Sequence, residues 1–173
     1  IPGGSTIKSS SNWRFFYIIE SMNYFLLKSE PDCFSIDDLA RVKQESWTGV
    51  RNYQARNSLR DSMNVGDVCF FYHSNCCPPA IVGLMRVASE ALPDMTALDI
   101  NNEHYDPKST LKNPIWITRT MEFLEKFKEP ISLTALKNDP ELSQMVVAQK
   151  GSRLSVTPVS EEHFQRILRE VKK

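Results

Sequence analysis

The fold is decided by residues 68–88, which read VCFFYHSNCCPPAIVGLMRVA. The first five positions, residues 68–72, are apolar or aromatic and predict a strand. The Pro-Pro pair that follows indicates a loop. A second apolar run at residues 80–88 predicts the next strand, in which Gly83 marks a bulge or a close approach of another backbone. We therefore expect both runs to belong to one curved sheet.

Further strands and helices can be placed outward from this stretch. A Ser with an acid three residues later predicts a helix that begins at Ser35, and Asn52 and Ser160 are typical N-caps. Residues 92–114 are rich in chain-breaking residues and indicate a long loop. The remaining strands are predicted at 24–28, 115–127 and 153–156, and the helices at 35–39, 52–62, 133–138 and 160–172. Five or six strands with short peripheral helices predict an α+β fold rather than βαβ units.

Length and charge limit the possible classes of protein. The chain has 173 residues, enough for one domain of ordinary size, and 41% of them are hydrophobic. Its 21 Lys and Arg balance its 21 Asp and Glu, which excludes a strongly basic nucleic-acid coat but leaves room for local basic patches. No apolar run approaches 18 residues, and the nearest candidate, residues 13–19, is short and contains Arg14. We therefore expect no membrane span.

The first 21 residues differ in composition from the rest. They begin rich in Gly and Ser and then become aromatic. We expect residues 1–21 to be an N-terminal extension, either disordered or introduced by cloning, and residues 22–173 to form the domain. The alternative is an additional strand over residues 15–19 that docks on a sheet edge.

The cysteines give no sign of a metal site or a disulfide framework. Cys33, Cys69, Cys76 and Cys77 contain no CxxC pair, and two adjacent cysteines suit neither a simple disulfide nor a zinc site. We expect all four to be reduced and metal-free in an intracellular compartment.

One candidate site surrounds Trp47, which lies in a loop just before the helix start at Asn52. A helix start offers free N–H groups to phosphates or base edges. Arg51, Arg56 and Arg60 follow, and aromatic side chains beside basic ones suit the stacking of a base and contacts to its phosphates. The alternative is that Trp47 belongs to the core and the arginines form a solvated face, and the pattern alone favours that alternative.

A second candidate lies where the strand at 68–72 ends. Polar groups at strand ends commonly line sites, and here Tyr72, His73 and Ser74 precede a loop. His73 with Cys76 could form a nucleophile pair or two metal ligands, but no third orienting group follows in the sequence.

Two further segments contain side chains that could take part in chemistry. Residues 28–32 contain acids that could form an acid–base couple with Asp67 or Asp106, although the spacing gives no support for it. The Gly-Ser-Arg step at 151–153 could bind an anion or form a tight turn. The sequence contains neither a GxxxxGK[ST] nor a GxGxxG phosphate motif.

Taken together and in order, five stretches resemble the EVE domain family. They are YFLLKSEP at 24–31, WTGVRNYQARN at 47–57, FYHSNC at 71–76, HYDP at 104–107 and RLSV at 153–156. They span nearly all of residues 22–172, and residues 1–21 lie outside the resemblance. The resemblance implies a PUA-like fold, a curved, mostly antiparallel β-barrel flanked by short helices and related to the YTH and ASCH domains.

The resemblance also implies a pocket that accepts one flipped, modified base and contains no catalytic machinery. The base would be methylated or hydroxymethylated cytosine in DNA, or a modified base in RNA, with the Trp47 ring as one wall. We expect no cofactor, and no metal because no ligand spacing fits a tetrahedral site. Phosphate contacts would come from Arg51, Arg56 and Arg60. The pocket residues implied by the family are Ser29, Glu30, Trp47, Asn52, Tyr53, Tyr72, His73, Ser74, Arg153 and Ser155.

Two functional hypotheses therefore stay open. The first is a non-enzymatic, monomeric reader of a modified base, whose partner is nucleic acid and not a membrane. It would be nuclear in a eukaryote and cytoplasmic otherwise. The alternative is a small hydrolase or nucleotide-processing enzyme that uses His73 with Glu30 or a cysteine.

Overall fold

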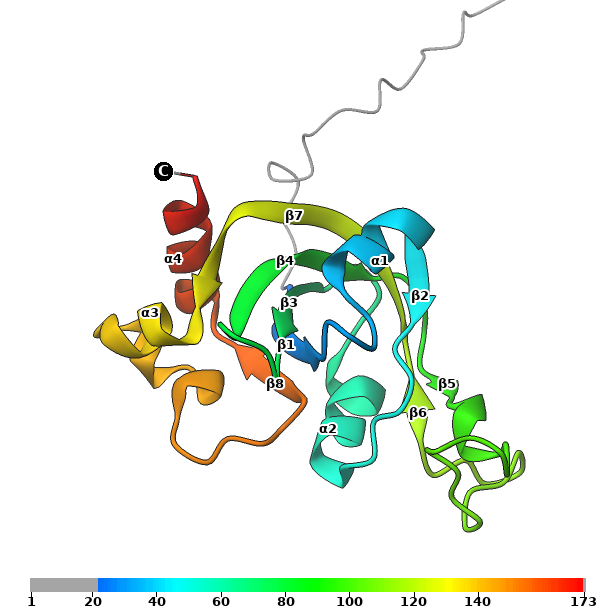
Figure 1. Cartoon of the computed structure of the whole chain (residues 1–173). Coiled ribbons are helices and arrows are strands. Elements are labelled where there is room, and N and C mark those ends of the chain that lie inside the picture. Colours follow the sequence, from blue (N-terminus) through cyan, green and yellow to red (C-terminus); the bar gives the residue numbers. More distant parts are fainter. Residues whose placement is uncertain (1–21, 173) are drawn as a thin grey trace, which may run out of the picture.

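A sheet of six strands forms the centre of the structure, a computed structural model that describes residues 22–172. The strand order is β2-β7-β4-β3-β1-β8, and β5 and β6 form a separate two-stranded sheet (Figure 1). The strands are β1 (Tyr24–Ser29), β2 (Gln44–Ser46), β3 (Val68–His73), β4 (Ala80–Val87), β5 (Leu92–Pro93), β6 (Ile117–Thr118), β7 (Thr120–Ser132) and β8 (Val156–Val159). The α-helices are α1 (Ile36–Val42), α2 (Tyr53–Asn57), α3 (Leu133–Asn138) and α4 (Glu161–Val171). The expectations for residues 1–21 lie outside the described residues.

The central sheet is curved and mostly antiparallel, which confirms the predicted fold class. Only β1 and β3 pair in parallel, and the sheet curls into a half-barrel whose edges are β2 and β8 (Figure 1). The register of β4 against β7 shifts on both sides of Gly83. A Cβ at Gly83 would clash with the carbonyl oxygen of Glu125 and lie 2.9 Å from Cδ1 of Ile36. The prediction of a bulge or close approach at this glycine is therefore confirmed.

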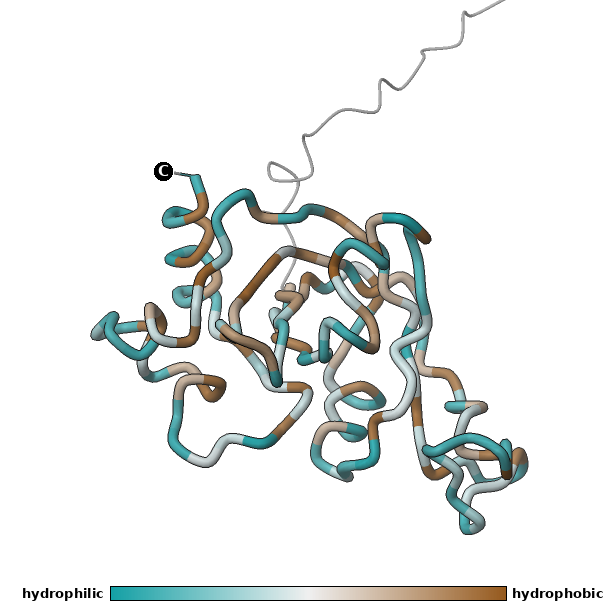
Figure 2. The backbone as a smooth tube through the Cα atoms, in the orientation of Figure 1, coloured by the Kyte–Doolittle hydropathy of each residue, from teal (hydrophilic) through white to brown (hydrophobic). Residues whose placement is uncertain are grey.

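The sheet is buried on both faces, which explains the continuous apolar runs of its central strands. Alternate residues of β1 and β3 enter two different hydrophobic clusters: Phe25 and Phe71 pack with α1 and α2, whereas Tyr24 and Phe70 pack against α4. Figure 2 shows the hydrophobic residues concentrated in these strands. No helix in the described part of the chain has the length and apolar character needed to cross a membrane.

The helix starts follow the predicted caps, but one helix changes type. Ser35 and Asp38 form the expected capping box of α1, and Ser160 caps α4. The helix predicted over 52–62 ends at Asn57 and continues as a π-helical turn, Ser58–Ser62. The buried guanidinium of Arg119 donates to the carbonyl oxygens of Leu59 and Met63, which supplies partners for this irregular end.

Three further predictions of strands and loops need correction. The strand expected at 153–156 is β8 at Val156–Val159, whose ladder with β1 begins at Val156 opposite Leu27, next to the bond from the Lys28 N–H to the Ser155 carbonyl oxygen. The strand expected over 115–127 is split into β6 and β7 at Arg119, whose side chain enters the interior. The loop predicted at 92–114 contains β5 and a 3₁₀ turn, Met95–Ala97. The sequence did not predict β2, because its three residues are all exposed and polar and therefore show no apolar pattern.

Candidate functional site

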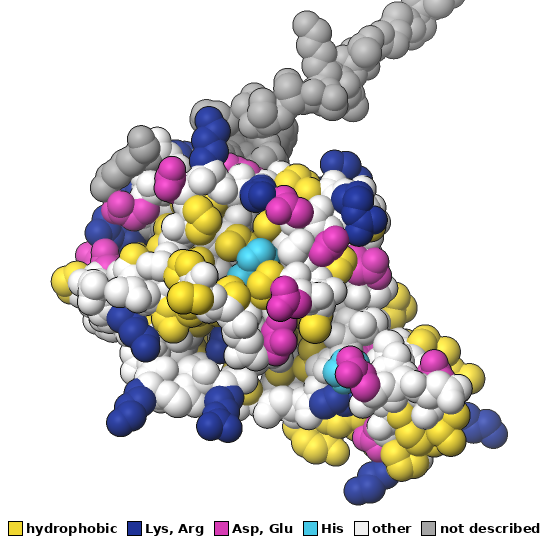
Figure 3. Space-filling model, viewed as in Figure 1, with side chains coloured by type: hydrophobic (Ala, Val, Ile, Leu, Met, Phe, Trp, Pro, Cys, Tyr) yellow, Lys and Arg dark blue, Asp and Glu magenta, His cyan; other side chains and the backbone are white. Residues whose placement is uncertain are grey.

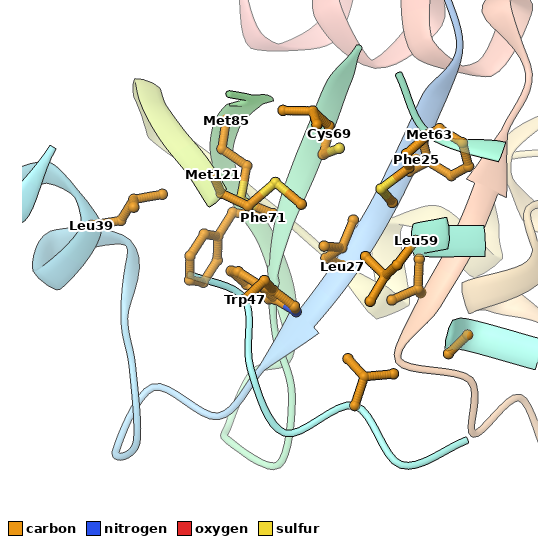
Figure 4. Packing of buried hydrophobic residues seen from close by; sticks show 14 of the residues in the cluster. Phe25, Leu27, Leu39, Trp47, Leu59, Met63, Cys69, Phe71, Met85 and Met121 are labelled. Carbon is orange, nitrogen blue, oxygen red and sulfur yellow. The ribbon is translucent and has the colours of Figure 1, made fainter. Parts of the chain in front are cut away.

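Trp47 belongs to the core and lines a cavity at the same time. It follows β2, and its backbone N–H donates to the carbonyl oxygen of Arg119 at 2.8 Å. Its side chain is 7% exposed and meets the ring of Phe71 edge to face, with the centroids 5.3 Å apart (Figure 4). The core alternative is therefore confirmed for Trp47, and the ring also lines a cavity, which leaves its predicted role as the wall of a base pocket open.

The cavity beside this ring, here called the Trp47 pocket, has a volume of about 280 Å³. It lies just below the range of roughly 300–1,000 Å³ that is common for small-molecule sites, which suits a small planar ligand. Trp47 and Phe34 provide two aromatic side chains, and the Ser29 hydroxyl donates to the carbonyl oxygen of Phe34 at 2.7 Å. The lining residues are Lys28, Ser29, Phe34, Glu45, Ser46, Trp47 and Thr48.

The loop that carries Trp47 is anchored by a buried carboxylate, Asp94. One Asp94 oxygen accepts from the Gly49 N–H at 2.9 Å and from Arg51 Nη1 at 2.8 Å, and the other accepts from Thr96. Gly49 has φ +81°, and a Cβ there would lie 2.8 Å from Nε2 of His104. Burial raises the pKa of Asp94, but hydrogen bonds from Arg51, Thr96 and Gly49 outweigh burial and hold the pKa below its usual value. These contacts tie the loop that carries Trp47 to the segment around Asp94.

Arg51, which the sequence suggested as a phosphate contact, serves this anchor. Besides Asp94, its guanidinium donates to Thr96 Oγ1 and to the carbonyl oxygens of His104 and Val50. Because these guanidinium donors are directed to protein acceptors, Arg51 holds the loop that carries Trp47 in the structure.

The other two arginines are partly engaged near α2. Arg56 donates to the carbonyl oxygen of Ile115 and lies 4.9 Å from the ring centroid of Tyr53. Arg60 is exposed and pairs with the neighbouring Asp61 through two nitrogens.

A second and larger cavity, here called the lysine hollow, has a volume of about 660 Å³. It lies between the end of β3, the loop after it, α3 and the segment before β8. Lys28 lines both cavities, so the hollow adjoins the Trp47 pocket. The lining residues are Lys28, Tyr72, Ser74, Asn75, Pro79, Leu133, Lys137, Val147, Ala148, Gln149, Lys150, Gly151 and Ser152.

The structure thus separates the predicted pocket residues. Ser29 and Trp47 line the Trp47 pocket, whereas Tyr72 and Ser74 line the lysine hollow. The Asn52 side chain caps α2 by accepting from the Gln54 and Ala55 N–H groups, so its oxygen is used locally.

The remaining predicted residues line neither of these two cavities. Tyr53 is 57% exposed and packs against Trp116, and the Glu30 carboxylate accepts from the Asn75 amide. Arg153 and Ser155 follow the hollow segment directly, and the Ser155 carbonyl accepts from the Lys28 N–H.

His73 has a structural partner instead of a catalytic one. Its Nε2 accepts a hydrogen bond from the Ile36 N–H at 3.1 Å, so it binds the first turn of α1. Burial lowers the pKa of His73 and keeps the imidazole neutral, as this bond requires. Neither Glu30 nor a cysteine bonds to His73 in the described part of the chain, so the geometry gives the enzymatic alternative no support.

Sequence reasoning missed several residues that line the two cavities. Lys28, Phe34, Glu45 and Thr48 line the Trp47 pocket, and residues 147–150 line the lysine hollow beside Gly151 and Ser152, which the sequence had offered as part of an anion site. Lys28 stood within the quoted 24–31 stretch, and its place at the end of a buried strand was an available signal. The others have no local pattern, because tertiary packing alone brings them to a cavity.

Comparison with known proteins agrees with this architecture. The model of the EVE domain family matches residues 23–170. The human thymocyte nuclear protein 1 is 42% identical over 165 residues, which cover 84% of this chain and 72% of that protein. A crystal structure of a Pseudomonas syringae protein is 47% identical with a TM-score of 0.82 and covers 86% of this chain and 99% of its own.

A further solved relative carries a ligand. It is the human THYN1 protein in complex with DNA that contains 5-methylcytosine, and it is 40% identical to this chain with a TM-score of 0.82. The match covers 88% of this chain and 99% of the human one. With the family model spanning nearly all the described residues and these relatives sharing the fold, the chain belongs to the EVE domain family.

Proposed function

We propose that this chain is a non-enzymatic module that binds DNA and takes one modified cytosine out of the duplex into the Trp47 pocket. The observation that carries the proposal is a cavity of about 280 Å³ lined by two aromatic side chains, three short hydroxyl side chains, Lys28 and Glu45. A flat, neutral base matches such a lining. The DNA complex of the human relative supports the choice of ligand. The relative's name, thymocyte nuclear protein, agrees with a nuclear location in a eukaryotic source.

The energetics of base flipping explain why the pocket needs aromatic walls. Removing a base from its stack costs a few kcal/mol, and stacking on an aromatic side chain returns about 1–3 kcal/mol per base. Trp47 and Phe34 can supply that stacking. Glu45 offers a carboxylate acceptor for the exocyclic amino group of cytosine. The zero net charge predicts modest affinity for bulk nucleic acid, so selectivity has to come from the pocket.

A binding panel tests the proposal directly. Duplexes of one sequence would carry cytosine, 5-methylcytosine or 5-hydroxymethylcytosine at one position, beside single-stranded RNA with and without one modified base. We expect tighter binding to a modified duplex than to the unmodified one, measured by fluorescence anisotropy at a fixed salt concentration. Equal affinity for all of them would contradict the proposal.

Arg56 is proposed as a phosphate contact on the α2 side of the site. Because contacts to phosphate carry no sequence information, Arg56→Ala should weaken binding to modified and unmodified duplexes by the same factor. Arg169→Ala, an exposed arginine on α4, is the matched control and should leave both affinities unchanged. A change in the ratio of the two affinities would assign Arg56 to the pocket instead.

A further inference from the structure

The lysine hollow has a charge that differs from that of the whole protein. Its lining contains Lys28, Lys137 and Lys150 and no carboxylate, although the chain balances 21 basic against 21 acidic residues. Lys and Arg side chains gather over α3 and the segment before β8 at the lower left of Figure 3, with acidic side chains further away. Such a local concentration of positive charge attracts anions.

The wall of the hollow also contains a polar group without a partner. The Ser152 hydroxyl is buried and forms no hydrogen bond among the described residues. A buried donor left unpaired is costly, so a ligand oxygen that supplied a partner here would gain binding free energy. The Gly151 backbone beside it has φ +77°, and a Cβ there would meet nothing within 4 Å, so the segment is open to a close approach.

Lys28 links the hollow to the base pocket. Its Nζ donates to the Ser152 carbonyl oxygen at 3.3 Å, and the residue lines both cavities. A strand whose base enters the Trp47 pocket therefore has a continuous path for its backbone past Lys28. Lys137 on α3 and Lys150 lie further along this path.

We infer that the lysine hollow is a phosphodiester-binding subsite that holds the strand beside the flipped nucleotide, with Lys137 and Lys150 as its phosphate contacts. The inference rests on the proposed function and extends it, because it assigns a second contact region on the other side of the pocket from α2. The subsite supplies affinity that does not depend on sequence, whereas the Trp47 pocket supplies the preference for the modified base.

The salt dependence of binding tests this subsite. Each lost phosphate contact reduces the slope of log K against log salt by about 0.9 for duplex DNA. For Lys137→Ala and for Lys150→Ala, the loss of affinity between 50 and 200 mM salt should therefore be about 3.5-fold smaller than for the wild-type protein. The ratio of affinities for 5-methylcytosine and unmodified duplexes should stay unchanged. Lys112→Ala, in the loop between β5 and β6, is the matched control and should keep the wild-type slope.

Two results would overturn the inference. One is an unchanged slope in the Lys137→Ala/Lys150→Ala double variant. The other is that the Lys137→Ala and Lys150→Ala variants lose binding to the free nucleotide 5-methyl-dCMP but not to the duplexes. The hollow would then bind the terminal phosphate of a free nucleotide and not the backbone of a strand. If the wild-type protein shows no preference for the modified duplex, the proposed function fails, while the slope still reports whether the hollow binds phosphates.

Discussion

Trp47→Ala is expected to abolish the preference for a modified duplex and to lower the free energy of unfolding by about 3–5 kcal/mol. The first effect follows because the ring lines the Trp47 pocket, and the second because the side chain is 7% exposed and packs on Phe71. Binding to both duplexes would be measured by fluorescence anisotropy at a temperature where circular dichroism shows a folded protein. Urea unfolding would give the stability.

A matched control separates the two effects of this substitution. Phe164→Ala removes a buried ring from the cluster on the other face of the sheet and should cost a similar free energy. It should keep the preference for the modified duplex. Trp47→Phe should retain most of the stability and part of the preference, because a smaller ring still stacks. If Trp47→Ala keeps the wild-type preference, the pocket is not the base site.

Asp94→Ala is expected to lower the free energy of unfolding by about 3 kcal/mol, at the lower end of the range for a broken buried ion pair because Arg51 is partly exposed. The substitution leaves the Gly49 N–H and the Arg51 guanidinium without their acceptor. Because this loop carries Trp47, the preference for the modified duplex should fall as well. Urea unfolding at pH 7 would measure the stability. Asp61→Ala, which breaks an exposed ion pair, should change stability by less than about 1 kcal/mol.

The pH dependence of stability gives a second check on Asp94. Its pKa is lower in the folded protein than in the unfolded chain, where it is about 3.9. The stabilisation of the folded protein by the ionised Asp94 is therefore fully present above the pKa of the unfolded chain. It is lost as the pH falls through the lower pKa of the folded protein. The difference in stability between wild type and Asp94→Ala should shrink as the pH falls below about 4. A difference that stays constant into acid would show that the charge of Asp94 contributes nothing.

Much of the fold could be predicted from local patterns. The strands β1, β3 and β4 are continuous apolar runs because both faces of the sheet are buried, and period and composition report this directly. The caps Ser35, Asn52 and Ser160 are recognisable because a cap is an interaction within one turn. β2 could not be found, because its pairing with β7 depends on backbone hydrogen bonds and leaves its side chains in solvent.

The candidate site was predictable only in part. Trp47 stands out by residue type, and the structure places it with Ser29 at one cavity, whereas the binding of a base there stays a prediction. Arg51 looked like a phosphate contact because its partner Asp94 lies 43 residues away and no local rule pairs them. The lysine hollow combines Lys28 with a distant segment of the chain, because Ser152, which bonds to Lys28, lies 124 residues after it.

By itself, the sequence determined the α+β class, the main strands and the helix starts, because each depends on residue type and on neighbours within a few positions. The tertiary structure alone decided which of the candidate residues share a cavity. It split them between the Trp47 pocket and the lysine hollow and gave Arg51 and His73 structural partners from distant segments. The physical reason is that a cavity is a product of long-range packing, in which charge and hydrogen bonding are settled between segments that no local pattern connects.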